Sequence, residues 1–492
     1  MRDIMGRVRD PRFDFSMEDI RSAMAAGRLL SMEMEFTRAC NYHCSYCYVS
    51  ETHLRNELTP EECRSVLKQA AELGARKIVV LGGEPLVYSH LEEMLDYIGS
   101  LGMVSEIFTN GSLVTPEAAA MLFRHRVRVI VKLNTLDPEN HDRLTGFKGS
   151  LQKTWDAIRN LEEAGYAGLD HMLGASTIIS TANLEEIPRM RVMLRERKLL
   201  PYFECITPQG RLLDHESLMP TADQLKAVFD ELAEIDRRYG FEWEPQPPLA
   251  GDKCFRHQYS CVVQSNGTVV PCVGLDAPIG NVREKSLKEI LSESLILYHL
   301  KNYRKFIKKP CADCDKIDHC YGCRGTAYQL TGDYLASDPT CWRNKDKQDQ
   351  ICFLPCSSDN MLPHARPMLF VDRLLKLGEK RAVTESVVRR DNPFVDGTGC
   401  LAREAFVEYA AQTAALMDSF EKDGRVSPGL LIEVQNFQVS GDAKIDDRIT
   451  VHLKKEFDMD IWHGVSVQIE VNGKSAAQGE LKLCIFDTPA GS

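Results

Sequence analysis

The chain has 492 residues, of which 43% are hydrophobic, and a formal net charge of −11 at pH 7. This length exceeds a single hydrophobic core, so about three domains are expected. The acidic balance argues against affinity for nucleic acid, which needs clustered Lys and Arg, and the sequence has no apolar run long enough to predict a membrane span.

The N-terminal segment, residues 1–30, begins MRDIMGRVRDPRF and lacks the apolar stretch of a signal peptide. We therefore expect a cytoplasmic protein. Disulfides are rare in that compartment, so its 17 cysteines must be explained in another way.

Three of these cysteines follow closely in the segment CNYHCSYCY. Cys40, Cys44 and Cys47 are spaced Cys-x3-Cys-x2-Cys. Iron-sulfur clusters are normally held by four thiolates, so three thiolates would leave one iron of a cubane open to a substrate or cofactor. The alternative is a structural zinc knuckle with His43 as the fourth ligand.

Alternating strands and helices are expected after this loop. The stretch KIVVL (77–81) reads as a buried strand that ends in the turn GGEP (82–85). Other strands are expected to end at 109–110 and 132–134, and further ones at 174–180 and 202–208. Helices are expected at 60–74 and 89–102, each closed by glycine. This order predicts parallel β-α units with polar residues gathered at the strand ends.

The three-cysteine loop followed by GGEP resembles the radical S-adenosylmethionine (radical SAM) superfamily. The resemblance implies an α/β fold in which residues 31–245 form a partial (β/α)6 barrel. It also implies that Cys40, Cys44 and Cys47 hold a 4Fe-4S cluster whose open iron is chelated by S-adenosyl-L-methionine. The residues implied to contact this cofactor are Tyr46, Gly82, Gly83, Glu84, Pro85, Thr109, Asn110, Asn134 and Ser176. Asn110, Asn134 and Ser176 could each instead cap a helix.

A second group of eight cysteines lies in residues 246–345, enough for two more cubanes. Its pattern, Cys254-x12-Gly267-x4-Cys272 and then Cys-x2-Cys-x5-Cys-x2-Cys, resembles the SPASM (twitch-type) extension of radical SAM enzymes. The resemblance implies two auxiliary 4Fe-4S clusters, one held by Cys254, Cys261, Cys272 and Cys323 and the other by Cys311, Cys314, Cys320 and Cys341. Two zinc ribbons are the alternative.

Two residues in this part of the chain qualify the resemblance. Sulfatase maturases of the family have an acidic residue directly after the third of these cysteines, whereas Val273 follows Cys272 here. Formylglycine formation is therefore not expected. Cys205, at the end of a predicted strand, is a candidate to face the barrel mouth, and the other unassigned cysteines are expected to be ordinary thiols.

A polar linker (346–360) leads to a third domain, residues 361–488. One helix (402–424) followed by four strands of period-two patterning predicts an α+β hotdog-like arrangement. The motifs LPHARPMLFVDRLL and DNPFVDGTG resemble β-hydroxyacyl-carrier-protein dehydratases. Glu408 occupies their catalytic carboxylate position, but Thr398 replaces their histidine base, and a hydroxyl cannot supply a base with a pKa near neutrality. His364 lies in the opening motif. We expect a module for dimerisation or for holding an acyl arm, with a surviving dehydratase as the alternative.

The resemblance implies an enzyme with three 4Fe-4S clusters that cleaves S-adenosylmethionine reductively and abstracts hydrogen from a substrate. An acyl or aminoacyl group on a carrier protein is the first substrate class that we expect, and a peptide is the alternative. An iron-sulfur protein without radical chemistry is a third interpretation. The expected partners are an electron donor such as flavodoxin or ferredoxin, a carrier protein or peptide, and a second copy of the chain through the hotdog domain.

Overall fold

The structure is a computed structural model that describes residues 11–49, 56–167, 169, 172–251, 253–359, 361–378, 380–421, 426–459 and 461–486. The chain divides into two compact units. Unit 1 comprises residues 1–329 and 334–348, and unit 2 comprises residues 330–333 and 349–492.

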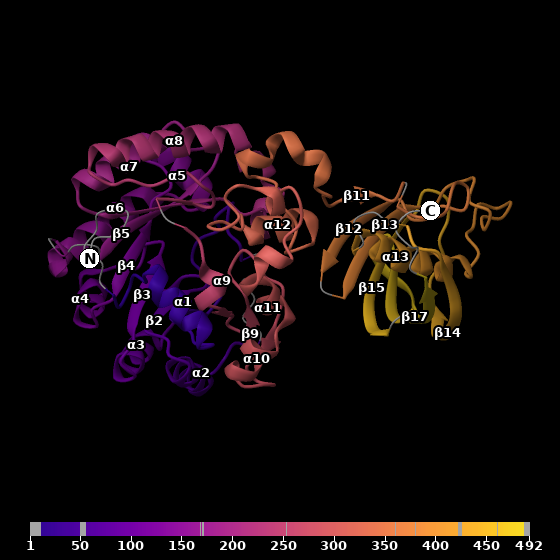
Figure 1. Cartoon of the computed structure of the whole chain (residues 1–492), viewed down its shortest axis with the longest axis horizontal. Helices are drawn as coiled ribbons and strands as arrows, with labels where there is room; N and C mark the ends of the chain where they lie inside the picture. The colour runs from indigo at the N-terminus through magenta and orange to yellow at the C-terminus, as the bar shows by residue number, and fades with distance from the viewer. Residues whose placement is uncertain are drawn as a thin grey trace. The chain divides into compact units, whose positions relative to one another are not determined.

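Unit 1 is built on six parallel strands in sequential order (Figure 1). The strands are β1 (Ser31–Glu35), β2 (Lys77–Leu81), β3 (Val104–Thr109), β4 (Arg128–Lys132), β5 (Leu173–Ile179) and β6 (Leu200–Cys205). The helices of this part are α1 (Met17–Ala25), α2 (Pro60–Glu72), α3 (Leu91–Ser100), α4 (Pro116–Arg124), α5 (Pro138–Thr145), α6 (Ser150–Leu161), α7 (Ile187–Glu196) and α8 (Ala222–Arg238). The expected parallel β-α architecture is confirmed.

The two faces of these strands differ in chemistry. On β1, Met32 and Met34 pack into the main hydrophobic core, whereas Ser31 and Glu33 line a cavity on the opposite face. The other strands of the sheet alternate in the same way, because successive side chains of a strand point to opposite faces. Apolar residues therefore meet the helices, and a mixture of polar and apolar residues faces inward.

The cysteine-rich region extends the same sheet at both edges. Its strands are β7 (Leu249–Ala250), β8 (Val262–Val263), β9 (Thr268–Val270) and β10 (Gly280–Asn281), and its helices are α9 (Arg256–Tyr259), α10 (Leu287–Glu293), α11 (Leu295–Lys301) and α12 (Arg324–Thr331). Strand β8 runs parallel to β1, with Glu33 beside Val262 and Met34 beside Val263. This register fixes which side of the sheet each residue of β8 faces.

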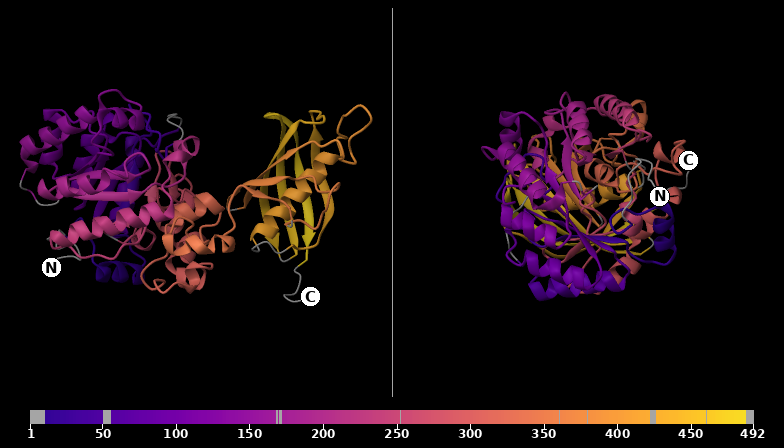
Figure 2. Two further views of the ribbon diagram at one scale, coloured as in Figure 1. Left: turned by 90° about the horizontal axis from the view of Figure 1, so that it is seen from above. Right: turned by 90° about the vertical axis from the view of Figure 1, so that its left-hand side faces the viewer.

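Unit 2 is a seven-stranded antiparallel sheet that packs on one long helix (Figure 2). Its elements are β11 (Cys356–Ser357), β12 (Arg373–Gly378), β13 (Arg381–Val387), α13 (Ala405–Glu421), β14 (Gly429–Val439), β15 (Arg448–Met459), β16 (Trp462–Val471) and β17 (Lys474–Ile485). The predicted helix and the four predicted strands are present, and three additional strands precede the helix.

The structure corrects the expected half-buried pattern of β14. This strand lies at the edge of the sheet, and most of its side chains are exposed, including Leu430, Leu431, Ile432 and Val434. Across the described part of the chain, no helix has the length and apolarity needed to cross a membrane.

Candidate functional site

A cavity of about 390 Å³ opens within unit 1, on the inward face of the six parallel strands. Cys40, Cys44 and Cys47 contribute to its wall, as do the Gly82–Glu84 turn and the strand end at Thr109 and Asn110. Cys254 of the auxiliary region lines the same cavity. Its volume lies in the range of small-molecule and cofactor sites.

The GGEP turn holds the backbone that leads into the cysteine loop. The amides of Gly83 and Glu84 donate to the carbonyls of Thr37 and Ala39, at 2.8 Å each. A Cβ atom at Gly82 would lie 2.2 Å from the Thr37 carbonyl oxygen, and one at Gly83 would lie 2.0 Å from that of Ala39. Glycine is therefore required here because the chain's own backbone approaches so closely.

A second segment, which the sequence analysis missed, holds the loop from another side. The amide of Arg211 donates to the Cys47 carbonyl at 2.9 Å, and its Nε donates to the Cys44 carbonyl at 3.0 Å. Gly210 has a φ of 59°, and a Cβ there would lie 2.4 Å from the Cys47 carbonyl oxygen. The only signal in the sequence is a Gly-Arg pair after a predicted strand.

Glu84 is buried and connects the ends of β2 and β3. Its Oε1 accepts from the Thr109 hydroxyl at 2.6 Å and from the Leu86 amide at 3.2 Å, while its Oε2 accepts from the Asn110 amide at 2.8 Å. Burial raises the pKa of Glu84, and these hydrogen bonds oppose that rise. The carboxylate thus fixes two strand ends at the cavity wall.

The other predicted cofactor contacts fall into two groups. Tyr46, Thr109 and Asn110 line the cavity, whereas Pro85, Asn134 and Ser176 do not. Asn134 lies behind Tyr46, and its Nδ2 donates to the Tyr46 hydroxyl at 2.5 Å. The Ser176 hydroxyl accepts from Lys132 Nζ at 2.9 Å. Asn134 and Ser176 therefore orient residues that reach the cavity.

Several of the predicted ligand sulfurs accept hydrogen bonds, as expected for cluster thiolates, whose potentials such bonds tune. Backbone amides donate to Cys40, Cys320 and Cys323, and the Asn344 amide group donates to Cys311, at 3.3 to 3.4 Å. In the described residues, no three Cys, His, Asp or Glu side chains converge on one point as a single metal ion requires. A cubane places each thiolate on a different iron and needs wider spacing. His43, the alternative zinc ligand, is exposed.

The cysteines predicted for the second auxiliary cluster lie around one small hollow. Cys311, Cys314, Cys320 and Cys341 all line it, together with Trp342 and Asn344. Four thiols around one hollow fit the ligand set of a cubane.

The cysteines predicted for the first auxiliary cluster do not all lie together. Burial raises the pKa of Cys272, and the nearby Cys323 and Cys254 thiols raise it further, so these three thiols are neighbours. Cys261 is fully buried in the main hydrophobic core, and burial raises its pKa to about 12, with Glu33 and Lys301 as its charged neighbours. The β1–β8 register turns Val262 toward the Glu33 side of the sheet, so Cys261 faces the opposite side. By this register Cys261 points away from the cavity that Cys254 lines.

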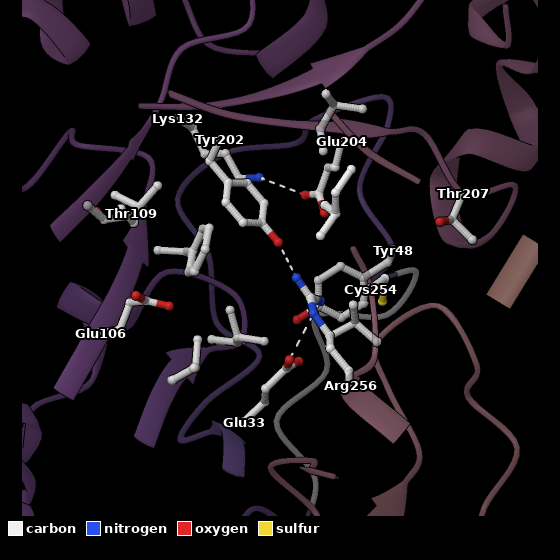
Figure 3. A pocket seen from close by; sticks show the side chains of 18 of the residues that line it. Glu33, Tyr48, Glu106, Thr109, Lys132, Tyr202, Glu204, Thr207, Cys254 and Arg256 are labelled. Atoms are coloured by element: carbon white, nitrogen blue, oxygen red, sulfur yellow. Dashed lines mark hydrogen bonds and ion pairs between the residues drawn. The ribbon is translucent and has the colours of Figure 1, made fainter. Parts of the chain in front are cut away.

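Charged side chains line the rest of the cavity in pairs (Figure 3). Glu106 lies 3.3 Å from Lys77 and 3.2 Å from Arg128. Glu204 lies 3.9 Å from Lys132. Arg256 donates to the Tyr202 hydroxyl and has its Nη1 3.6 Å from Glu33 Oε1. Each of these four cationic side chains thus already has an acidic side chain as its partner.

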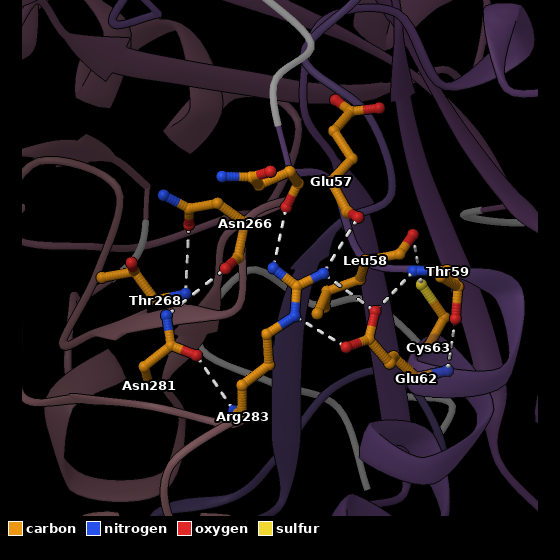
Figure 4. Close-up of polar contacts among 10 residues, drawn as sticks. Glu57, Leu58, Thr59, Glu62, Cys63, Asn266, Thr268, Asn281 and Arg283 are labelled. Carbon is orange, nitrogen blue, oxygen red and sulfur yellow. Dashed lines mark hydrogen bonds and ion pairs between the residues drawn. The ribbon is translucent and has the colours of Figure 1, made fainter.

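The auxiliary region is joined to the barrel by Arg283 (Figure 4). Its guanidinium donates to both carboxylate oxygens of Glu62, at 2.6 and 2.9 Å, and to the carbonyls of Asn56 and Glu57. The Glu57 carboxylate in turn accepts from the Arg38 amide at 2.7 Å. This chain of contacts ends two residues before Cys40.

In unit 2, Glu408 lies beside a histidine. Its Oε1 is 3.7 Å from His364 Nε2 and accepts from Gln412 Nε2 at 2.7 Å. Thr398 is exposed, and its hydroxyl donates to the Asp396 carboxylate at 2.6 Å. His364 of the opening motif therefore places its imidazole beside Glu408, the predicted catalytic carboxylate.

Comparisons with known proteins agree with this organisation. Residues 34–192 match the radical SAM superfamily, residues 254–315 match the SPASM iron-sulfur cluster-binding domain, and residues 356–489 match the ApeP dehydratase family. An AdoMet-dependent heme synthase of Methanosarcina barkeri is 29% identical over 345 residues, which cover 64% of this chain and 96% of the relative. A PqqA peptide cyclase of Streptomyces rochei is 29% identical over 342 residues, which cover 64% and 90%.

Solved structures show the same fold for unit 1. Streptococcus suis SuiB bound to precursor peptide SuiA has a TM-score of 0.51 and 16% identity, with coverage of 65% of this chain and 78% of that one. The protein anSMEcpe with bound AdoMet has a TM-score of 0.52 and 16% identity, with coverage of 65% and 92%.

The chain therefore combines a radical SAM domain with an iron-sulfur cluster-binding domain and is an enzyme of the radical SAM type. It carries a SPASM domain after the barrel and a C-terminal domain of the ApeP dehydratase type. This confirms the three-part architecture expected from the sequence.

Proposed function

We propose that the protein abstracts a hydrogen atom from a substrate held in the 390 Å³ cavity, between the three-cysteine loop and the auxiliary region. The observation that carries this proposal is that Cys40, Cys44, Cys47 and Cys254 all line one cavity. When bound, the cluster and S-adenosylmethionine supply the 5'-deoxyadenosyl radical, since cofactors carry the hard chemistry.

The chain's own residues position the reactants. Glu84, Thr109 and Asn110 hold the cofactor side of the cavity, and Tyr46 of the cysteine loop lines the cavity as well. The apolar part of the wall includes Phe108 and Tyr202, whose rings pack edge to face at 5.3 Å. Three 4Fe-4S clusters, one at the loop and two auxiliary, form part of this proposal, with flavodoxin or ferredoxin as the electron donor.

The substrate that we propose is an acyl or aminoacyl group on a carrier protein. The fusion to a dehydratase-type domain supports it, because that domain is related to proteins that handle carrier-bound acyl groups. A modified peptide is the second candidate, supported by the similarity to a PqqA peptide cyclase. The named relatives differ in substrate, so the relatives alone do not select one.

The test is anaerobic formation of 5'-deoxyadenosine by reconstituted protein under a strong reductant, with and without acylated carrier proteins or candidate peptides. A rise that depends on carrier protein supports the first substrate, and a rise that depends on peptide supports the second. Cys44→Ala is the control and should abolish cleavage. If Cys44→Ala still cleaves S-adenosylmethionine, the cysteine loop does not hold the cluster required for this reaction.

We also propose a role for the C-terminal domain in holding the acyl arm near Glu408. The His364–Glu408 pair favours a second candidate activity, dehydration. Removal of an α-proton by His364 and protonation of a β-hydroxyl by Glu408 would yield the enoyl thioester and water. Hydration of crotonyl-pantetheine by the purified protein tests this role, and Glu408→Gln should abolish it.

Dimerisation through this domain is a further part of the proposal. The edge strand β14 exposes Leu430 and Ile432, which are 58% and 47% accessible, along an open line of backbone groups. Such an edge is suited to pairing with a second copy. Light scattering should show a dimer that the double variant Leu430→Glu, Ile432→Glu converts to a monomer, and an unchanged mass would exclude this surface.

A further inference from the structure

Glu33 has an unusual position for a carboxylate. It lies in the middle of β1 and is only 6% exposed, yet its side chain lines the cavity. It also lies near the auxiliary region, since Arg256 is 3.6 Å away and strand β8 pairs with β1 at Glu33. A substrate between the two cofactor regions would therefore meet this carboxylate.

Only one oxygen of the Glu33 carboxylate has a charged or hydrogen-bonding partner among the described residues. Oε1 faces Arg256 at 3.6 Å, while Oε2 has no hydrogen-bond partner among the described residues. A buried acceptor without a partner is destabilising, and more so when it is charged. Such atoms are rare in proteins and call for an explanation.

Four cations along the cavity wall already have partners, and among the described residues none of them donates to Oε2. Lys77 and Arg128 face Glu106, Lys132 faces Glu204, and Arg256 is shared between Glu33 and Tyr202. Burial raises the pKa of Glu33, and Arg256 and Lys77 oppose that rise. An incoming ammonium group would give Oε2 the donor that it lacks.

We infer that Glu33 Oε2 accepts a hydrogen bond from a primary ammonium group of the substrate. The substrate class is therefore one that carries a free amine, such as an aminoacyl group or a peptide N-terminus, rather than a plain acyl chain. This inference rests on the proposed function, because it takes the cavity as the substrate site. A charged donor suits the position, since hydrogen bonds between ionised groups are about twice as strong as neutral ones.

The test compares alanyl-pantetheine with propionyl-pantetheine, two probes that differ in the α-ammonium group. Binding is measured by anaerobic calorimetry on the reconstituted full-length protein with S-adenosylmethionine present. A tripeptide with a free or an acetylated N-terminus provides a second pair, which separates a peptide amine from an aminoacyl thioester. The wild-type protein should bind the amine member of at least one pair about tenfold more tightly.

Glu33→Gln keeps the shape of the side chain and should lose this preference while still binding propionyl-pantetheine. The matched control is Glu204→Gln, which alters a cavity carboxylate that already faces Lys132 and should keep the preference. Equal affinity for both members of each pair in the wild type, no binding of any amine probe, or a preference that survives in Glu33→Gln would overturn the inference.

The same samples separate this inference from the proposed function. Affinity for S-adenosylmethionine is measured beside the probes. If the wild-type protein fails to bind this cofactor, the proposed function fails, whereas loss of amine preference alone removes only the role of Glu33. Circular dichroism of Glu33→Gln confirms that the variant is folded.

Discussion

The placement of Cys261 gives a sharp prediction about iron content. Three 4Fe-4S clusters correspond to about twelve irons per chain. Cys272 belongs to the group of neighbouring thiols, so Cys272→Ala should lose about four of these irons. Cys261 faces the hydrophobic core across the sheet from the cavity, so Cys261→Ala should retain about twelve.

The expected stability change of Cys261→Ala is also small. A buried free cysteine behaves as a small hydrophobic residue, so removal of its sulfur should cost about 1 kcal/mol in the free energy of unfolding, near the lower end of core truncations. The assay is iron per chain after anaerobic reconstitution, with Mössbauer spectra to count cluster types. If Cys261→Ala loses about four irons while Cys272→Ala loses the same number, Cys261 is a ligand and the argument from strand register is wrong.

Three further predictions concern other parts of the chain. Asp236→Asn should lower stability by about 3–5 kcal/mol in urea unfolding, because it breaks a fully buried pair with Arg191. The pKa of Asp236 is lowered to about 2, so its contribution to stability is present above about pH 4 and lost as the pH falls toward 2; a flat acid profile would contradict this. Arg283→Ala should change the free energy of unfolding by only about 1 kcal/mol or less, because its pair with Glu62 is partly exposed. Glu408→Gln should leave 5'-deoxyadenosine formation at the wild-type rate, and its loss would show that the two units are coupled.

Local patterns were sufficient to predict much of the barrel. The strand Lys77–Leu81 has the predicted bounds, because a continuous apolar run between Lys and Gly-Gly leaves few alternatives. The strand expected at 202–208 instead spans Leu200–Cys205. The chain leaves the sheet before Pro208, which cannot donate a backbone hydrogen bond.

Buried polar positions explain why β13 was missed. Its inward residues are Ala382, Thr384 and Ser386, all almost fully buried. The Thr384 hydroxyl makes a 2.7 Å hydrogen bond with Thr413 of α13, which satisfies both groups inside the core. A hydropathy pattern cannot identify such a strand, because its buried side carries hydroxyls and its polarity does not alternate.

Strand β1 shows the same limit of hydropathy patterns at the cavity wall. In β1, the sequence SMEME alternates acidic and apolar residues, which in an ordinary two-layer sheet places the acids in solvent. In this barrel the inward face also carries charged side chains, and Glu33 and Glu35 are both buried. Arg38, the partner of Glu35, lies three residues further along the chain, whereas Arg256, the partner of Glu33, comes from a distant segment. The sequence motifs therefore identify the cofactor side of the cavity, whereas the charges that a substrate would meet follow only from which strands close around it.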